Sequence, residues 1–228
     1  KKDSDIFSKY LLAELKKFKN STILVPTATL NILETNEIFK KSETKSSRMG
    51  FFSEFIRLRK NSLRSDHPLW SFAALGYYSK EITMNVPKTC YGRNSIFDRL
   101  LEYNSYFICF GDIKSSLAPI HYIEQIVGAP YRYFKEFKIK SQTKKKKKID
   151  TYYFNAMFQS LKIIKDDNNK IIKILLKDRV IKVFKNKKFN IYFAEYSKMI
   201  KNLFQIYDKN QKIYLKKEKI NFSKNFKF

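Results

Sequence analysis

The sequence of 228 residues contains little cysteine, histidine and glycine, with two, two and five residues respectively. So few histidines and cysteines, placed apart along the chain, make no cluster of metal ligands. No Gly-rich phosphate loop occurs, and no apolar run approaches the ~18 residues that a membrane span requires. The first residues also lack the apolar centre of a signal peptide. We therefore expect a soluble protein of the reducing cytoplasm that uses no metal ion.

Acidic residues are scarce as well. The chain has 21 Asp and Glu against 47 Lys and Arg, a formal net charge of +26, and residues 131–228 hold 28 of the basic but only 8 of the acidic ones. Such a charge suggests nucleic acid or another polyanion as a partner. The surplus is mostly lysine among Ile, Asn, Phe and Tyr, whose codons are rich in A and T. Genome composition explains that pattern more simply, so nucleic acid is not the expected partner.

The chain does contain enough apolar material for a core, since 43% of its residues are hydrophobic and 16% are aromatic. Short apolar runs alternate with segments of helical periodicity, which is typical of α/β proteins. We predict a three-layer α/β/α sandwich around one central sheet. The strands of this sheet are expected at residues 22–26, 71–75 and 106–110, and the covering helices at residues 5–18, 50–59 and 118–127.

The predicted domain organisation is one α/β core, residues 1–138, followed by a lysine-rich part of the same domain, residues 139–228. This second part is expected to form a basic, partly β appendage with a disordered tail. Within it, Ile171–Leu176 has the β-branched content of a strand, and Glu195–Ile206 has helical spacing. The five-lysine run Lys144–Lys148 is typical of an exposed loop.

The densest group of polar side chains lies in Arg64–Gly76, which also contains His67 and the only tryptophan. Pro68 disfavours the α conformation at the residue before it, so His67 is not expected inside a helix. The apolar run that follows is typical of a buried strand, which places this imidazole at the mouth of a sheet. Because imidazole titrates near neutral pH, His67 is a candidate general base, with Asp66 and Asp112 as alternative orienting carboxylates.

Five short blocks in the first 138 residues are similar to the sequence signatures of one enzyme family. They are Ile23-Leu24-Val25-Pro26-Thr27, Ser47-Arg48-Met49-Gly50, the run from Arg64-Ser65 through His67-Pro68 to Ser71, Tyr91-Gly92-Arg93-Asn94-Ser95, and the helix of His121 and Glu124 that leads to Pro130-Tyr131-Arg132. In this order and spacing, they resemble the aminoglycoside 3-N-acetyltransferase family. These enzymes depend on acetyl-CoA and are unrelated in fold to the Gcn5-type acetyltransferases.

The resemblance implies an N-acetyltransferase that moves the acetyl group of acetyl-CoA directly onto an amine of an aminoglycoside or amino sugar. In that reaction His67 is the candidate general base, with Asp112, Asp66 or another carboxylate to orient it, and backbone N–H groups near Thr27 and Ser47 or the hydroxyl of Ser71 could donate to the developing oxyanion. The implied coenzyme A site consists of Thr27, Ser47, Met49, Gly50, Arg64, Ser65 and Ser71. The implied acceptor site consists of Tyr91, His121 and Glu124.

The chain departs from the family pattern at several places. Ser115 and Ala118 stand where members that act on aminoglycosides often have a carboxylate and a threonine. The sequence also starts after the strand and His-Ser-Ser segment that usually come first in the family, as if it were truncated. The acceptor is therefore open between an antibiotic and a polysaccharide amino sugar, and a homodimer is permitted. Two other functions stay open: a polyanion-binding protein, and a family member that has lost catalysis.

Overall fold

A computed structural model describes residues 2–35, 37–142, 147–158, 168–185 and 189–215. The chain divides into two compact units that are interleaved in sequence. The first comprises Lys1–Cys90, Asn94–Ile96 and Glu136–Phe154, and the second comprises Tyr91–Arg93, Phe97–Lys135 and Asn155–Phe228. Each unit is described by itself below.

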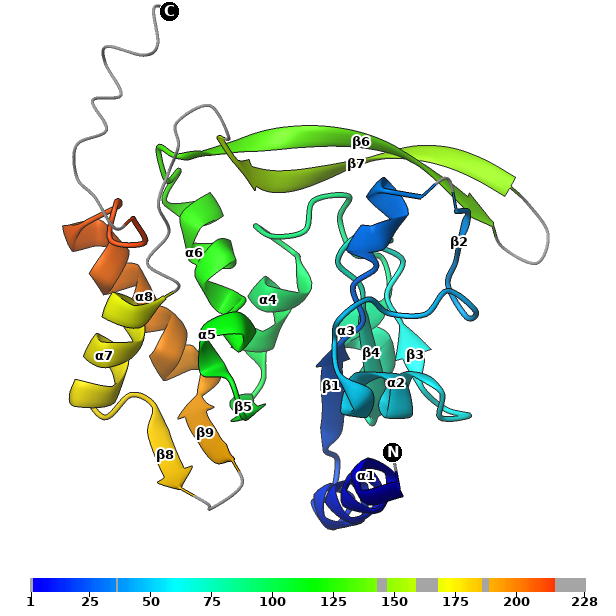
Figure 1. The fold of residues 1–228 in the computed structure, drawn as a ribbon, viewed down its shortest axis with the longest axis horizontal. Coiled ribbons are helices and arrows are strands. Elements are labelled where there is room, and N and C mark those ends of the chain that lie inside the picture. Colours follow the sequence, from blue (N-terminus) through cyan, green and yellow to red (C-terminus); the bar gives the residue numbers. More distant parts are fainter. Residues whose placement is uncertain (1, 36, 143–146, 159–167, 186–188, 216–228) are drawn as a thin grey trace, which may run out of the picture. The chain divides into compact units, whose positions relative to one another are not determined.

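The first unit contains a three-stranded antiparallel sheet in the order β1-β4-β3 (Figure 1). Its strands are β1 (Thr22–Pro26), β3 (Leu63–Arg64) and β4 (Phe72–Gly76). The register pairs Thr22 with Gly76 and Pro26 with Phe72, so the two longer strands match along their whole length. Their apolar, β-branched and small residues suit a sheet that is covered by helices.

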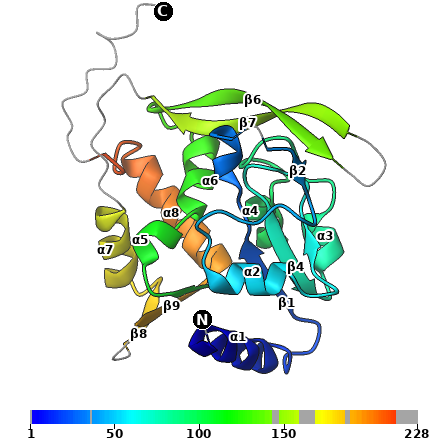
Figure 2. The same cartoon turned by 45° about the vertical axis from the view of Figure 1, so that its right-hand side comes forward.

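Helices of the first unit pack against this sheet (Figures 1 and 2). They are α1 (Lys2–Leu15), α2 (Phe51–Arg57) and α3 (Ser79–Thr83), with a 3-10 turn, η1, at Leu30–Leu33. Leu12 from α1 and Phe55 and Ile56 from α2 form a buried cluster with Val25 and Ala73 of the strands. Burying these side chains is the main source of stability for this layer.

A second sheet is built on a long hairpin. Strands β6 (Arg132–Gln142) and β7 (Lys147–Met157) pair with each other, and the short β2 (Phe39–Lys40) adds to β6 in parallel. Thr151–Phe154, which the sequence indicates as a strand, lies within β7. Of the predicted lysine loop, Lys144–Lys146 lie outside the described residues, and Lys147 and Lys148 already belong to β7.

The second unit contains an antiparallel sheet in the order β5-β9-β8, formed by β5 (Tyr106–Phe110), β8 (Lys182–Lys185) and β9 (Asn190–Glu195). Its longer helices are α6 (Pro119–Ile126), α7 (Asn169–Lys177) and α8 (Tyr196–Lys209), and α8 packs against the other two (Figure 2). Shorter segments are α4 (Ile96–Arg99), η2 (Leu100–Glu102) and α5 (Ile113–Ser116). Within the described ranges, no helix combines the length and apolarity needed to cross a bilayer.

The predicted α/β class is confirmed, and the predicted strands and covering helices are present with ends that shift by a few residues. One predicted arrangement was wrong. Tyr106–Phe110 does not share a sheet with β1 and β4, because it pairs with β9 instead. The predicted strand at Ile171–Leu176 was also wrong, since this segment is in α7 with Ile171, Ile172 and Leu175 buried on one face.

Gly76, at the end of β4, gives a test of this fold. Its φ is +138°, and a Cβ there would lie 2.2 Å from the carbonyl oxygen of Ser21. Gly111 has a φ of +97°, yet a Cβ there would meet nothing within 4 Å. Both Gly→Ala changes cost conformational energy, but only Gly76→Ala adds a backbone clash. We expect Gly76→Ala to lower the free energy of unfolding by about 1–3 kcal/mol more than Gly111→Ala, measured by urea denaturation. Equal losses would contradict the close approach of β4 to Ser21.

Candidate active site

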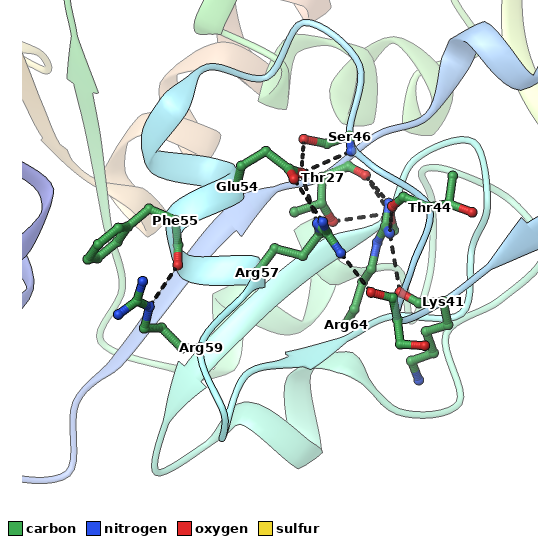
Figure 3. A network of polar contacts seen from close by, with 11 residues as sticks. Thr27, Lys41, Thr44, Ser46, Glu54, Phe55, Arg57, Arg59 and Arg64 are labelled. Carbon is green, nitrogen blue, oxygen red and sulfur yellow. Dashed lines mark hydrogen bonds and ion pairs between the residues drawn. The ribbon is translucent and has the colours of Figure 1, made fainter. Parts of the chain in front are cut away.

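Arg64 of β3 is a buried arginine whose side chain is only 5% exposed. Its Nη1 donates to the carbonyl oxygens of Lys41 and Thr44 at 3.2 and 2.5 Å, and its Nη2 donates to that of Thr27 at 2.6 Å (Figure 3). Its Nε donates to the hydroxyl of Ser71 at 3.0 Å. Burial, followed by repulsion from another arginine, lowers the pKa of Arg64 to about 10, so the group remains charged at neutral pH. The guanidinium N–H groups therefore donate to groups of the chain itself and are not available to a phosphate.

The hydroxyls next to this arginine are also satisfied from within. Ser71 Oγ donates to the carbonyl oxygen of Thr27 at 2.8 Å and lies 3.1 Å from Thr27 Oγ1. The Oγ of Ser65 accepts the backbone N–H of Phe72 at 3.0 Å. Thr27, Ser65 and Ser71 have no exposed surface. These predicted ligand contacts therefore join β1, β3 and β4 to one another.

An ion pair on α2 contacts the segment directly before this helix, which also contains Lys41 and Thr44. Glu54 Oε2 lies 2.8 Å from Arg57 Nη2, and Oε1 accepts from Arg57 Nε at 2.8 Å. Oε1 also accepts the backbone N–H and the hydroxyl of Ser46, at 2.9 and 2.5 Å, while Arg57 Nη1 donates to the carbonyl oxygen of Ser42 (Figure 3). Burial alone would raise the pKa of Glu54, but the hydrogen bonds from Arg57 and Ser46 outweigh it and lower the pKa to about 2.

The remaining predicted cofactor residues lie where this loop enters α2. Ser47 and Met49 are half-buried, and Gly50 is exposed. The backbone N–H of Ser47 donates to the carbonyl oxygen of Ala28 at 2.8 Å, which fixes its position. Gly50 has a φ of +83° and nothing within 4 Å of where its Cβ would be. Of the seven predicted cofactor contacts, these three are the ones that a ligand can reach.

His67 is buried, with both ring nitrogens engaged by the chain itself. Nδ1 accepts the backbone N–H of Trp70 at 3.1 Å, so Nε2 carries the hydrogen and donates to the carbonyl oxygen of Lys88 at 3.1 Å. The ring packs edge-on against Tyr152. Burial lowers the pKa of His67 to about 4, although the backbone hydrogen bonds act in the opposite direction. These contacts leave no acceptor nitrogen for a substrate proton.

A small cavity lies beside this imidazole. It is lined by Ser65, His67, Trp70, Phe72, Val86, Pro87, Thr89, Cys90, Ser95 and Ile96. The Cys90 sulfur is 3.5 Å from His67 Nε2, but burial raises the pKa of the Cys90 thiol well above its ordinary value. A neutral thiol beside an N–H group is a packing contact and not an activated nucleophile.

His121 and Glu124, on α6 of the second unit, form a close pair. Nδ1 of His121 lies 2.7 Å from Oε2 of Glu124, whose side chain is fully buried, whereas that of His121 is 26% exposed. Burial alone would raise the pKa of Glu124, but the neighbouring His121 and Arg132 outweigh it and lower the pKa. Oε2 of Glu124 and Nη2 of Arg132 both lie within hydrogen-bond reach of Nδ1, at 2.7 and 3.1 Å; in the tautomer that donates Nδ1–H to the carboxylate, Nε2 carries the lone pair. Within the described part of the chain, Nε2 has no hydrogen-bond partner.

Three further side chains surround the Glu124 carboxylate. Arg132 Nη2 donates to Oε2 at 2.7 Å, while the hydroxyls of Tyr131 and Tyr207 donate to Oε1 at 2.8 and 3.3 Å. Burial, together with the adjacent carboxylate, raises the pKa of both tyrosines, so they remain protonated donors. A buried carboxylate with this many donors is held in one orientation, and it fixes the imidazole in turn.

The structure places the other two predicted residues of this unit differently. The ring centroid of Tyr91 is 5.7 Å from that of His121, in an edge-on contact that agrees with a shared site. Asp112 instead caps its own helix, α5. It accepts the N–H of Lys114 at 3.0 Å and the hydroxyl of Ser115 at 2.5 Å, and the Ser115 hydrogen bond is the main reason why its pKa is lowered.

Several residues of both clusters were not selected from the sequence. Arg132 and Tyr131 lie in the Pro-Tyr-Arg block, where a cation and a phenol next to a predicted His–Glu face could have suggested partners for the carboxylate. Glu54 and Arg57 have the three-residue spacing of a helical ion pair. Tyr207 is far from the other members in sequence, and no local pattern marks it.

The buried His67 predicts a stability change with pH. The folded protein keeps the imidazole neutral down to about pH 4, whereas the unfolded chain takes up a proton near the ordinary value of 6.5. This contribution is therefore fully present above pH 6.5 and is lost as the pH falls towards 4. We expect the free energy of unfolding of His67→Gln to fall by about 3 kcal/mol less than that of the wild type between pH 6.5 and 4, measured by urea denaturation. Identical pH profiles would contradict a neutral, buried imidazole.

The chain was compared with known proteins. It matches the aminoglycoside 3-N-acetyltransferase family over residues 13–207. Similar solved structures include the AAC-IIIb binary complex with CoASH, at 17% identity and a TM-score of 0.76, covering 89% of this chain and 83% of that one. Sisomicin-bound AAC-VIa has 15% identity and a TM-score of 0.74, with 89% and 85% covered. YokD from Bacillus subtilis has 20% identity and a TM-score of 0.67, with 83% and 79% covered.

A comparison with curated proteins gives no match. These three solved structures are below 25% identity and establish the fold, which agrees with the α/β architecture described above. The family match spans most of the chain and includes every predicted site residue. The chain belongs to the aminoglycoside 3-N-acetyltransferase family.

Proposed function

We propose that this protein transfers the acetyl group of acetyl-CoA to an amine of an aminoglycoside or amino sugar. The observation that carries this proposal is the pair formed by His121 and the buried Glu124. An amino-sugar amine is largely protonated at neutral pH, and it must lose a proton on becoming an amide. A histidine with one nitrogen held by a carboxylate and the other free to accept is suited to that task.

In this proposal the general base is His121 and not His67. The two histidines differ in what their acceptor nitrogens contact: Nδ1 of His67 accepts from the backbone of Trp70, while Nε2 of His121 is unpaired within the described residues. Tyr91 packs on the edge of the His121 ring and limits its rotation. The predicted role of His67 is therefore replaced by a structural one.

When bound, acetyl-CoA supplies the acetyl group as a thioester. His121 Nε2 accepts the proton that the amine releases while its nitrogen forms the new bond to the acetyl carbon and the carbon–sulfur bond breaks. Glu124 accepts the hydrogen bond from Nδ1 throughout and stabilises the imidazolium that forms. The imidazolium then returns its proton to the departing thiolate or to solvent.

Coenzyme A is expected at the segment that precedes α2. The similar AAC-IIIb structure is a complex with CoASH, which supports the use of this cofactor. In the present chain, Ser47, Met49 and Gly50 are reachable, and Gly50 lacks a side chain that would obstruct a ligand. The exposed Arg48 adds a guanidinium that can pair with phosphate oxygens. Thr27, Arg64, Ser65 and Ser71 would support this segment from behind without touching the ligand.

A cytoplasmic location suits this reaction. Cys90 and Cys109 are both free and buried, as is usual in a reducing compartment. Sisomicin, which is bound to the similar AAC-VIa, is an example of the acceptor class that we propose to test first.

A substitution at His121 tests the assignment of the base. His121→Gln removes the proton acceptor and should lower kcat by about 10²–10⁴-fold, with little change in coenzyme A affinity. Glu124→Gln should also lower kcat, because a neutral amide stabilises the imidazolium less than the carboxylate does. Turnover is measured as thiol release from acetyl-CoA against a panel of aminoglycosides and amino sugars, and affinity by calorimetry.

Two results would contradict the assignment. If folded His121→Gln retains near-normal turnover with an acceptor that the wild type uses, His121 is not the base. If folded His67→Gln loses turnover instead, the base is the histidine first indicated by the sequence. Circular dichroism of each variant shows that the comparison is made on folded protein.

A further inference from the structure

The segment before α2 is held by side chains at four of its residues. We call residues 41–47 the pinned loop. Arg64 binds the carbonyl oxygens of Lys41 and Thr44. The α2 ion pair holds the other two positions, since Arg57 binds the carbonyl oxygen of Ser42 and Glu54 accepts from Ser46 (Figure 3).

Arg64 and the α2 ion pair differ in which other parts of the chain they bind. Arg64 also binds Thr27 and Ser71, so its loss would disturb the sheet. Outside α2, the side chains of Glu54 and Arg57 have hydrogen bonds only to the pinned loop among the described residues. Their side chains are 17% and 6% exposed, which limits the competition from water for these bonds. Removing the ion pair should therefore loosen the pinned loop while the sheet stays intact.

We propose that Glu54 and Arg57 are positioning residues that order the pinned loop for coenzyme A. This inference rests on the proposed function, in which the ligand contacts the residues directly after Ser46. Without the ion pair, the loop keeps its local turn, in which the N–H groups of Glu43 and Thr44 bind the carbonyl oxygen of Lys40. It also keeps the Arg64 hydrogen bonds at Lys41 and Thr44, but it loses its attachments at Ser42 and Ser46, so ligand binding must order these two positions. That cost appears as weaker affinity for coenzyme A and not as slower proton transfer.

Glu54→Gln and Arg57→Gln, each in the full chain, test the proposal. We expect the Kd for coenzyme A and the KM for acetyl-CoA to rise about tenfold, while kcat at saturation and the KM for the acceptor stay close to wild type. Glu14→Gln is the control for charge, because Glu14, in the last turn of α1, pairs with Lys17 at the same three-residue spacing. Arg59→Gln is the control for arginine, because Arg59 stacks on the Phe55 ring and does not reach the pinned loop.

A reversed ion pair separates positioning from simple stabilisation. The double variant Glu54→Arg with Arg57→Glu restores opposite charges on α2, but it places a carboxylate near the carbonyl oxygen of Ser42 and a cation near the N–H of Ser46. If the pair only stabilises the helix, this variant recovers both the Tm and the coenzyme A affinity. If it positions the loop, the Tm recovers while the affinity remains low.

The outcomes distinguish this inference from the function on which it rests. No binding of coenzyme A by the wild type at millimolar concentration overturns the proposed cofactor and the positioning role together. Binding by the wild type and equally tight binding by Glu54→Gln and Arg57→Gln overturns the positioning role alone. A tenfold loss that Glu14→Gln and Arg59→Gln reproduce has the same consequence, since it would reflect charge or stability in general.

Discussion

A guanidinium group inside a protein must find acceptors for its N–H groups, and the first unit is arranged around that requirement at Arg64. The acceptors come from Thr27 directly after β1, from the segment before α2 and from Ser71 directly before β4. None of these segments can move away without leaving part of a buried charge unpaired, a change that typically costs about 3–5 kcal/mol. One side chain from a two-residue strand thereby fixes the relative positions of three parts of the chain.

The second unit uses the opposite charge in the same way. Glu124 collects donors from α6, from the start of β6 and from α8. Both clusters consist of one ionised group with several short-range partners, and in both the pKa is shifted without loss of the charge. They differ in access, because the partner of the carboxylate that reaches solvent is an imidazole, whose ring nitrogens can donate or accept a hydrogen bond.

The sequence predicted the positions of helices and strands more accurately than it predicted which strands pair. Thr22–Pro26 and Tyr106–Phe110 have a clear strand composition, and both are strands. Which strand lies next to which is a long-range property, and nothing in Tyr106–Phe110 indicates β9 as its neighbour, more than 80 residues away. Ile171–Leu176 is apolar and β-branched, but lysines at helical spacing allow one face to be buried in α7, and tertiary packing overrides the local propensity.

The same limit applies to the site. Pro68 does exclude His67 from a helix, as predicted, yet the sequence could not show that Trp70 and Lys88 would use both ring nitrogens. The spacing of His121 and Glu124 did place them on one face, and this was a local inference. The difference in their burial, which decides the chemistry, comes from Tyr131 and Tyr207 packing over the carboxylate and depends on the whole unit.

The groups around the Glu124 carboxylate also fix the orientation of the His121 imidazole. A half-turn of the His121 ring would exchange Nδ1 for a carbon and leave Glu124 short of a donor in a site that water does not reach. The ring therefore has one resting orientation, and its two nitrogens are not interchangeable. Nδ1 lies against the buried carboxylate, and Nε2 has no hydrogen-bond partner among the described residues. The ring nitrogen that is left to meet a ligand is thus set when the protein folds, before any ligand arrives.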